Sequence, residues 1–132
     1  MAEFVVDCGV VLRLAADETM LPAKHKLLAP TLLRSQTLSA VHEAVQRGNL
    51  TAEAGREQLR RVNSMPIRLL GDAVLRRRAW DVAEQLGWPE TYDAEYIALT
   101  QLQADAFVTL NTKLARQVEK LVRVVTIDEL KA

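Results

Sequence analysis

The sequence predicts an α/β fold with a mainly parallel central sheet and helices packed around it. Short β-rich runs alternate with longer segments of helical periodicity along the chain, which is typical of crossover units around a parallel sheet. The chain has 132 residues, of which 49% are hydrophobic. This length and composition suit one domain with its own core, so we expect residues 1–132 to form a single domain.

Residues 4–70 are expected to contain three strands and three helices. Apolar runs rich in β-branched residues predict strands, and apolar residues that recur at helical spacing predict helices. The expected strands cover residues 4–6, 26–29 and 66–70, and the expected helices cover 10–15, 32–45 and a segment after Thr51. Pro30 suits a turn or a first helical position, and Thr51 suits an N-cap.

The second half of the chain continues the same alternation. Asp72 opens a helix with one apolar face, and Gly87 ends it. The next helix, around residues 96–102, is apolar almost all round, which predicts burial on several sides and a central position. A strand over 106–110, a helix over 112–120 and a final strand over 122–127 complete the expected order.

Overall charge and composition bound the function only loosely. Seventeen basic and seventeen acidic residues balance, so any site for a polyanion must be a local patch. The lone Cys8 cannot form an internal disulfide, and no Cys/His spacing suggests zinc. The start of the chain offers no export signal, and no stretch approaches the roughly 18 apolar residues of a membrane span. We therefore expect a cytoplasmic protein.

Polar residues placed directly after strands are the first candidates for a functional site, because open parallel sheets bind ligands outside the carboxyl ends of their strands. Asp7 and Asn111 each follow an expected strand. Asp93 lies at the start of the very apolar helix, where a carboxylate needs a partner. Each residue also has a simpler interpretation: Asp7 and Asn111 can cap the helices that follow them, and Asp93 gains from the helix dipole.

Four segments of the chain resemble the PIN-domain family of the VapC toxin kind, and they occur in the order typical of that family. They are Val5-Val6-Asp7, Ala29-Pro30 through Leu38, Tyr92-Asp93-Ala94 with the following Tyr96-x-Ala98-Leu99, and Val108-Thr109-Leu110-Asn111. The third and fourth segments together are the most specific part of the match. The resemblance implies a PIN-like three-layer α/β/α sandwich with a mainly parallel central sheet of about five short strands.

The resemblance also implies an activity and partners. Proteins of this kind are Mg²⁺- or Mn²⁺-dependent endoribonucleases that cut single-stranded RNA. They are usually homodimers, and they are often the toxin of a pair restrained by a small VapB-like antitoxin. By motif position, their four acidic residues correspond here to Asp7, Gln36, Asp93 and Asn111, so this sequence has two carboxylates and two amides. Thr109, within the fourth segment, can orient a ligand or a water, or can simply be a strand residue.

The two amides decide how much of the implied activity carries over. Mg²⁺ needs oxygen ligands and negative charge, and such an ion can activate a water and neutralise charge on the scissile phosphate. Gln36 and Asn111 offer a carbonyl oxygen of similar shape, but they bring no charge and add NH₂ donors that a cation repels. Asp7 and Asp93 could still hold one ion, more weakly. A second ion is not expected.

Three interpretations therefore stay open. The first is a PIN-type ribonuclease with a weakened site, in which Asp7 and Asp93 bind the metal. The second is a non-catalytic PIN fold that acts as a protein-binding or RNA-binding module. The third is that Gln36 and Asn111 were introduced to disarm a toxic protein, since Glu→Gln and Asp→Asn preserve shape. Whether the chain is an enzyme is thus left open.

Basic and aromatic residues outside these motifs are expected to have structural roles. The arginine runs at residues 60–61 and 76–78 could contact RNA phosphates, but a solvated helix face is the preferred interpretation. Trp80 could stack on an unpaired base, although packing against neighbouring helices is the preferred expectation for it.

Overall fold

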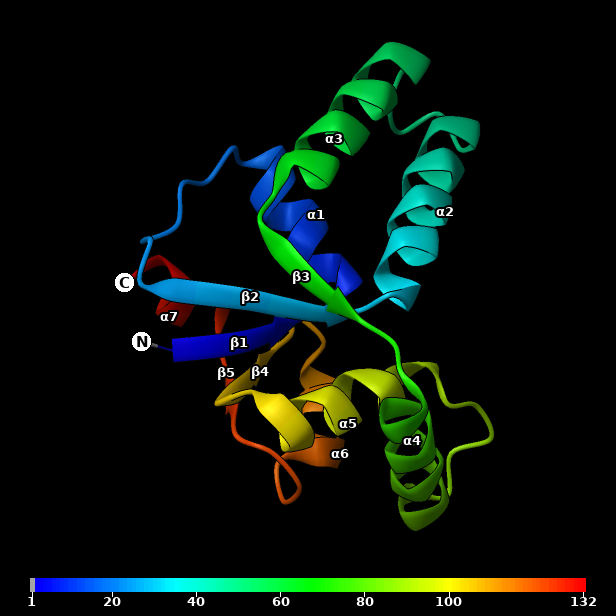
Figure 1. Cartoon of the computed structure of the whole chain (residues 1–132). Coiled ribbons are helices and arrows are strands. Elements are labelled where there is room, and N and C mark those ends of the chain that lie inside the picture. Colours follow the sequence, from blue (N-terminus) through cyan, green and yellow to red (C-terminus); the bar gives the residue numbers. More distant parts are fainter. Residues whose placement is uncertain (1) are drawn as a thin grey trace.

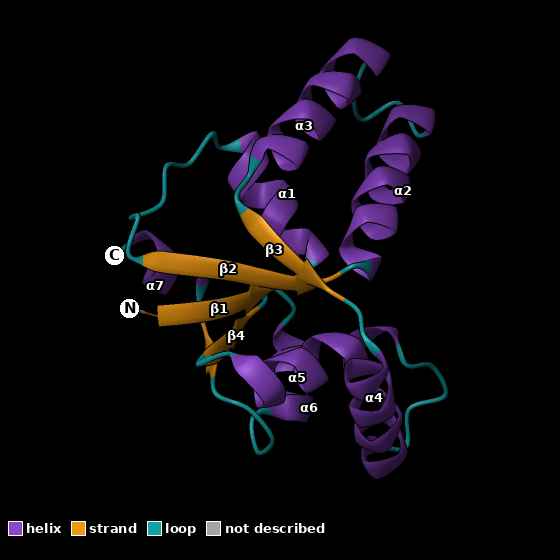
Figure 2. Ribbon diagram, viewed as in Figure 1, coloured by secondary structure: helices purple, strands orange, loops and turns teal. Residues whose placement is uncertain are grey.

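A five-stranded parallel sheet forms the middle of the molecule, and helices cover both of its faces (Figure 1, Figure 2). The computed structural model describes residues 2–132. The strands, in the spatial order β3-β2-β1-β4-β5, are all parallel to their neighbours. They are β1 (Ala2–Val6), β2 (His25–Pro30), β3 (Ile67–Leu70), β4 (Ala106–Val108) and β5 (Val124–Val125). The predicted α/β class with a parallel sheet of five short strands is confirmed.

Seven helices connect or follow these strands within the described part of the chain. They are α1 (Cys8–Ala16), α2 (Leu32–Gln46), α3 (Ala52–Ser64), α4 (Ala73–Leu86), α5 (Tyr92–Gln103), α6 (Thr112–Val118) and α7 (Ile127–Lys131). In Figure 1, α1, α2 and α3 lie on one side of the sheet, and α4, α5 and α6 lie on the other. Right-handed crossovers require this division, because the chain steps outward from β1 in one direction and returns to β4 on the other side.

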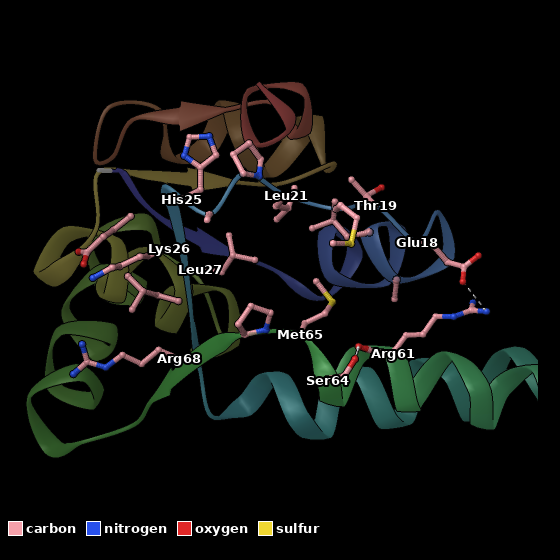
Figure 3. A pocket seen from close by; sticks show the side chains of 18 residues that line it. Glu18, Thr19, Leu21, His25, Lys26, Leu27, Arg61, Ser64, Met65 and Arg68 are labelled. Carbon is pink, nitrogen blue, oxygen red and sulfur yellow. Dashed lines mark hydrogen bonds and ion pairs between the residues drawn. The ribbon is translucent and has the colours of Figure 1, made fainter.

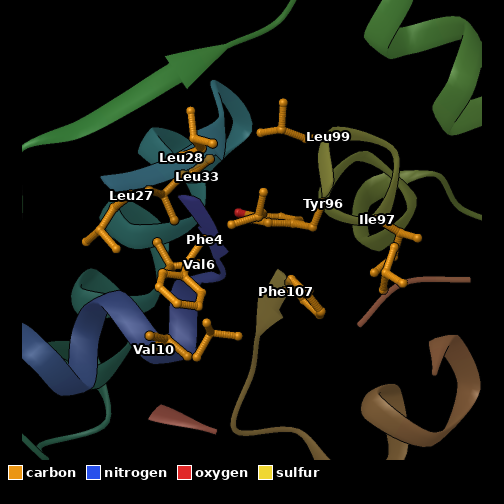
Figure 4. Close-up of a cluster of buried hydrophobic side chains, with 14 of the residues drawn as sticks. Phe4, Val6, Val10, Leu27, Leu28, Leu33, Tyr96, Ile97, Leu99 and Phe107 are labelled. Atoms are coloured by element: carbon orange, nitrogen blue, oxygen red, sulfur yellow. The ribbon is translucent and has the colours of Figure 1, made fainter. Parts of the chain in front are cut away.

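The core lies between the sheet and the two helical layers. Figure 4 shows Phe4 and Leu27 of the sheet beside side chains of the α1 and α2 layer, and Tyr96 of α5 beside Phe107 of β4. The ring centroids of Tyr96 and Phe107 are 6.3 Å apart. Helix α5 buries nearly every position from Ala94 to Thr100, as its all-round apolar sequence predicts. This helix therefore holds the residues at its amino-terminal end firmly against the sheet.

Local signals in the sequence explain where several helices begin and end. The side chains of Thr51 and Asp72 cap α3 and α4, accepting hydrogen bonds from the backbone N–H groups of Ala54 and Leu75 at 3.0 and 2.8 Å. Gly87 closes α4 in the left-handed conformation, with φ of 69°. These three predictions are confirmed.

The α2–α3 hairpin depends on a close approach at Gly55. A Cβ atom added at this position would lie 2.8 Å from Cγ2 of Val45 and 3.3 Å from Cγ1 of Val41. The two helices can therefore pack at this spacing because residue 55 has no side chain.

The final segment of the sequence was predicted wrongly. The strand expected over residues 122–127 is reduced to the two residues of β5, and Ile127 begins the short helix α7. Thr126 occupies the N-cap position, two acidic residues follow in the first turn, and Leu130 is completely buried. A run of β-branched residues supports a strand by propensity, but here the burial of Leu130 favours a helical turn.

Three smaller expectations are also corrected. Strand β4 ends at Val108 instead of residue 110, and Leu110 is 40% exposed. Pro30 is the last residue of β2 instead of a turn or helical residue. It pairs with Leu70 of β3, but the pairing of β2 with β1 already ends at Leu28. The N–H group that proline lacks is therefore not needed for a hydrogen bond to β1. Trp80 does not pack against neighbouring helices, because 65% of it is exposed.

No helix in residues 2–132 combines the length and the apolar character needed to cross a membrane.

Candidate functional site

The chain adds β2 and β3 to the sheet on one side of β1, and then crosses back to add β4 and β5 on the other side of β1. Strands β1 and β4 are neighbours in the sheet, but the helices that follow them, α1 and α6, lie on opposite sides of it (Figure 1). The two loops therefore diverge at the carboxyl ends of β1 and β4, and this switch point is where open α/β sheets usually bind their ligands. Asp7 leaves β1 at this point, and Thr109 and Asn111 follow β4.

Both carboxylate oxygens of Asp7 are held by hydrogen bonds from the protein. Oδ1 accepts from the backbone N–H of Val10 at 3.0 Å and so caps α1. Oδ2 accepts from Oγ1 of Thr109 at 2.5 Å. The capping interpretation of Asp7 is thus confirmed. These two hydrogen bonds do not use all of the acceptor capacity of the carboxylate, because each oxygen can accept from a second partner.

The environment of Asp7 disfavours its negative charge. Burial raises the pKa of the Asp7 carboxyl above its ordinary value, and the negative charge of Asp93 raises this pKa further. The hydrogen bonds from Thr109 and from the Val10 N–H act in the opposite direction without cancelling the rise. The charge of Asp93 is therefore close enough to act on Asp7.

Asp93 lies in the first turn of α5, as expected, and its side chain reaches solvent. Partial desolvation raises the pKa of the Asp93 carboxyl, and the charge of nearby Glu90 adds to the rise. A cation bound between Asp7 and Asp93 would offset the repulsion that both groups experience.

Gln36 contacts this region through Tyr96. The Tyr96 hydroxyl, on α5, donates a hydrogen bond to Oε1 of Gln36 on α2 at 2.5 Å. Tyr96 is only 2% exposed. Burial, and then the charges of Cys8, Asp7, Glu95 and Asp93, raise the pKa of this phenol far above its ordinary value. The hydroxyl is therefore always a donor, and it fixes the orientation of the Gln36 carboxamide.

The sequence was not sufficient to identify Tyr96 as part of this arrangement. Its place in the apolar stripe of α5 indicates a core residue, which it also is. The available signal was chemical: a tyrosine in the most buried helix needs a hydrogen-bond partner for its hydroxyl.

Asn111 acts as a helix cap. Its Oδ1 accepts from the backbone N–H of Leu114 at 3.0 Å, which confirms the capping interpretation. Its own backbone N–H donates to Oγ1 of Thr109 at 3.1 Å. Thr109 is 8% exposed, so its buried hydroxyl contacts protein groups on both sides and orients Asp7.

These residues offer a metal ion a small set of donors. Among residues 2–132, no group of three or more His, Cys, Asp or Glu side chains could hold a metal ion. The carboxylates of Asp7 and Asp93 fit one hard cation that keeps several waters. The amide oxygens of Gln36 and Asn111 each already accept one hydrogen bond, and neither supplies charge. The set therefore fits one ion and does not fit two.

Two neighbouring carboxylates do not join this set. Glu43 forms an exposed ion pair with Arg47 at 2.8 Å. Burial raises the pKa of the Glu95 carboxyl, and the charge of Arg76 on α4 acts in the opposite direction without cancelling the rise.

Comparison with solved structures shows the fold. No protein-family model matches the sequence, and no curated protein matches it. The chain is similar to PAE2754 from Pyrobaculum aerophilum, with a TM-score of 0.78 and 22% sequence identity over 98% of this chain and 92% of that one. It is also similar to VapBC2 from Rickettsia felis, solved bound to a DNA fragment from its promoter, with a TM-score of 0.67 and 11% identity over 94% of this chain and 98% of that one. The fold is a PIN-like α/β/α sandwich.

Proposed function

We propose that the chain is a Mg²⁺- or Mn²⁺-dependent endoribonuclease of the PIN and VapC kind that cuts single-stranded RNA with attenuated activity. The observation that carries this proposal is the position of Asp7 at the switch point between β1 and β4, close enough to Asp93 for the charge of Asp93 to raise the pKa of Asp7. Each of these carboxylates has its pKa raised, and Asp93 contributes to the rise at Asp7. Such a pair is stabilised by a bound divalent cation.

The roles of the individual residues follow from their hydrogen bonds. Asp7 and Asp93 would hold the ion, which when bound can activate water and neutralise charge on a phosphate. Thr109 and the Val10 N–H hold the Asp7 carboxylate in one orientation. Since the amide oxygens of Gln36 and Asn111 accept hydrogen bonds from protein groups, their NH₂ groups remain available as donors for a phosphodiester oxygen.

The same proposal includes a biological role. A toxin restrained by a small VapB-like antitoxin, acting as a homodimer in the cytoplasm, is what the sequence resemblance implies. The structural likeness to VapBC2 supports this role. Copurification of the chain with the product of an adjacent small gene, followed by measurement of the mass of the complex in solution, would test it.

A second candidate function is a non-catalytic PIN fold that binds protein or RNA. The hydrogen bonds within the site favour it, because both Asp7 oxygens and both amide oxygens already have protein partners. A site so satisfied needs no metal ion to be stable.

RNA digestion in the presence of Mg²⁺ or Mn²⁺ separates the two candidates. We expect slow cleavage that stops with a chelator and in the double variant Asp7→Ala with Asp93→Ala. Asp81→Ala, which removes an exposed carboxylate from α4, is the matched control and should cleave normally. Cleavage that survives the chelator would exclude the metal mechanism. No cleavage, together with no Mn²⁺ binding by calorimetry at millimolar concentration, would favour the binding module.

Restoring the two missing charges tests the attenuation. Gln36→Glu combined with Asn111→Asp should raise metal-dependent cleavage and cell toxicity by at least tenfold, because a fuller acidic set binds the ion more tightly. No gain would mean that the loss extends beyond two charges. The sequence of the native gene tests the remaining interpretation, since a gene that encodes Gln36 and Asn111 excludes deliberate disarming.

A further inference from the structure

A second cavity lies at the opposite end of the sheet from Asp7. Its volume is about 790 Å³, and it is formed around the amino-terminal end of β2 (Figure 3). Asp7, Gln36, Asp93 and Asn111 do not line it. We call it the basal pocket. The basal pocket lies between three parts of the chain: the end of α1 and the segment after it, the start of β2, and the end of α3 together with the start of β3. The residues that line it are Glu3, Leu14, Ala15, residues 18–23, residues 25–28, Arg61, residues 64–66 and Arg68.

The basal pocket exists because β2 begins before β3 does. The first residue of β3, Ile67, pairs with Leu27, so His25 and Lys26 have no neighbour on that side of the sheet. The segment after α1 passes over the gap without filling it. The resulting volume lies within the roughly 300–1,000 Å³ of small-molecule sites.

Apolar side chains form most of the lining. Leu14 and Leu27 are buried at its base, while Leu21 and Met65 are partly buried. Met20, on the segment after α1, is 91% exposed at the rim. Because this apolar side chain is not buried against the protein, it is available to cover an apolar ligand. Methionine is flexible and adapts to the shape of such a ligand.

The charges around the basal pocket are distributed unequally. At one end, Figure 3 shows Lys26 and Arg68. Neither cation forms an ion pair with another described residue. Glu3 also belongs to this end, since it pairs with Lys26 in the strand register, so two positive charges and one negative charge meet there.

The other end of the pocket is balanced. The Glu18 carboxylate lies 3.4 Å from Arg61 and links the segment after α1 to α3. A ligand would therefore place one negative charge at the Lys26 and Arg68 end, where it neutralises the excess, and extend an apolar body toward Leu21 and Met65.

We propose that the basal pocket binds a small amphiphile with one anionic head group and a linear apolar body, such as an alkyl carboxylate. The head group contacts Lys26 and Arg68, whose side chains point to one face of the sheet, and the apolar chain crosses the unpaired edge of β2 to reach Leu27 on the other face. This site is independent of the proposed ribonuclease function, because none of the residues proposed for metal or RNA binding contributes to it.

Titration with decanoate below its micelle concentration, followed by amide chemical shifts, tests the proposal. We expect saturable one-site binding, with the largest shifts at residues that line the basal pocket. Arg68→Gln and Lys26→Gln should each weaken binding about fivefold, the effect of one partly exposed charge. Lys24→Gln removes a nearby cation that does not line the pocket and should leave the affinity unchanged.

Two further measurements keep the test decisive. Ala23→Trp places a bulky side chain at an exposed loop position in the pocket wall; it should abolish binding without changing the urea unfolding midpoint. Decanol, which has the same chain and no charge, should bind at least fivefold more weakly than decanoate. The proposal is overturned if decanol binds equally well, if Lys24→Gln weakens binding as much as Arg68→Gln, if the shifts map elsewhere, or if decanoate shows no saturable binding at millimolar concentration.

Discussion

The Thr109 hydroxyl donates a hydrogen bond to Oδ2 of Asp7 at 2.5 Å, and its own oxygen, Oγ1, accepts a hydrogen bond from the backbone N–H of Asn111 at 3.1 Å. One buried hydroxyl therefore connects the ends of β1 and β4 at the point where the sheet changes its winding direction. Local structure, packing and the candidate site all depend on this small group.

Removing this hydroxyl should destabilise the protein. In Thr109→Val, Asp7 loses a donor and the Asn111 N–H loses an acceptor, which costs roughly 1–3 kcal/mol of the free energy of unfolding. Thr109→Ser keeps the hydroxyl and should lose less than half as much. Urea unfolding at neutral pH measures both, and equal losses in the two variants would show that the methyl group matters and the hydrogen bonds do not.

Asp7→Asn should stabilise the protein at neutral pH, although it removes a proposed metal ligand. Burial and Asp93 raise the pKa of Asp7, so the folded state binds the Asp7 proton more tightly than the unfolded state does. The associated stability is fully present below the unfolded pKa, near 3.8, and is lost as the pH rises through the folded pKa. Asparagine carries no charge and keeps an acceptor for the Val10 N–H.

The expected gain at pH 7 is about 0.5–2 kcal/mol, and it should shrink as the pH is lowered toward 4. Urea unfolding at several pH values provides the measurement. A variant that is less stable than the native chain at pH 7 would show that the ionised carboxylate is favourable in its folded environment.

The hydrogen bond between Tyr96 and Gln36 should appear in a double-mutant cycle. Tyr96→Phe and Gln36→Ala remove the same interaction from opposite sides, so their effects on the free energy of unfolding should fall short of additivity by about 1 kcal/mol. Tyr96→Phe combined with Gln103→Ala is the control, because Gln103 lies at the exposed far end of α5. Additivity in both pairs would mean that the Tyr96 hydroxyl contributes nothing through Gln36.

Cys8 should react slowly with alkylating agents. Burial, aided by the charge of Asp7, raises the pKa of the Cys8 thiol from 9.0 to about 11. At pH 8, two pKa units correspond to about 100-fold less thiolate, which is the reactive form. Iodoacetamide should therefore modify the folded chain about 100-fold more slowly than the urea-unfolded chain. The Asp7→Asn variant should react somewhat faster than the native fold, because one of the two causes of the shift is gone.

Glu18→Gly should make the end of α1 more stable. Glu18 has a φ of 52°, in a helix-ending turn closed by hydrogen bonds from Thr19 N to Leu14 O and from Glu18 N to Ala15 O. Glycine adopts this conformation without the Cβ penalty of roughly 1–2 kcal/mol, part of which is offset by its greater freedom in the unfolded chain.

The Glu18–Arg61 ion pair is lost in this variant, but the Glu18 side chain is 70% exposed and solvent screens the pair, so the loss is small. We expect a net gain of up to about 1 kcal/mol in urea unfolding. Glu18→Gln, which removes the ion pair and keeps the strained backbone, is the control and should not be stabilised. A loss of stability in Glu18→Gly beyond that of Glu18→Gln would refute the strain argument.

The sequence was sufficient for most of the fold because the relevant signals are local. Apolar periodicity located eleven of the twelve elements in order, and the caps at Thr51 and Asp72 follow from neighbouring residues. The expected last strand overlapped β5 but was too long, since a two-residue strand has no measurable period. Helix α7 was missed, since the burial of Leu130 depends on packing by distant segments.

The candidate site, like the fold, could be predicted only in part from the sequence. The positions of Asp7, Asp93 and Asn111 after strands or at a helix start could be predicted, because chain order and parallel topology place them at one edge. The contact between Tyr96 and Gln36 spans 60 positions and depends on how α2 and α5 are rotated, which no local pattern specifies.

The capping role of Asn111 has a consequence for how such a chain can change. A helix cap needs an oxygen that accepts a backbone N–H, and asparagine supplies one as well as aspartate does. Exchange of one for the other at position 111 therefore changes the charge at the carboxyl end of β4 while leaving α6 intact. Folding and local charge are separable at this position, because the start of α6 does not depend on which of the two residues caps it.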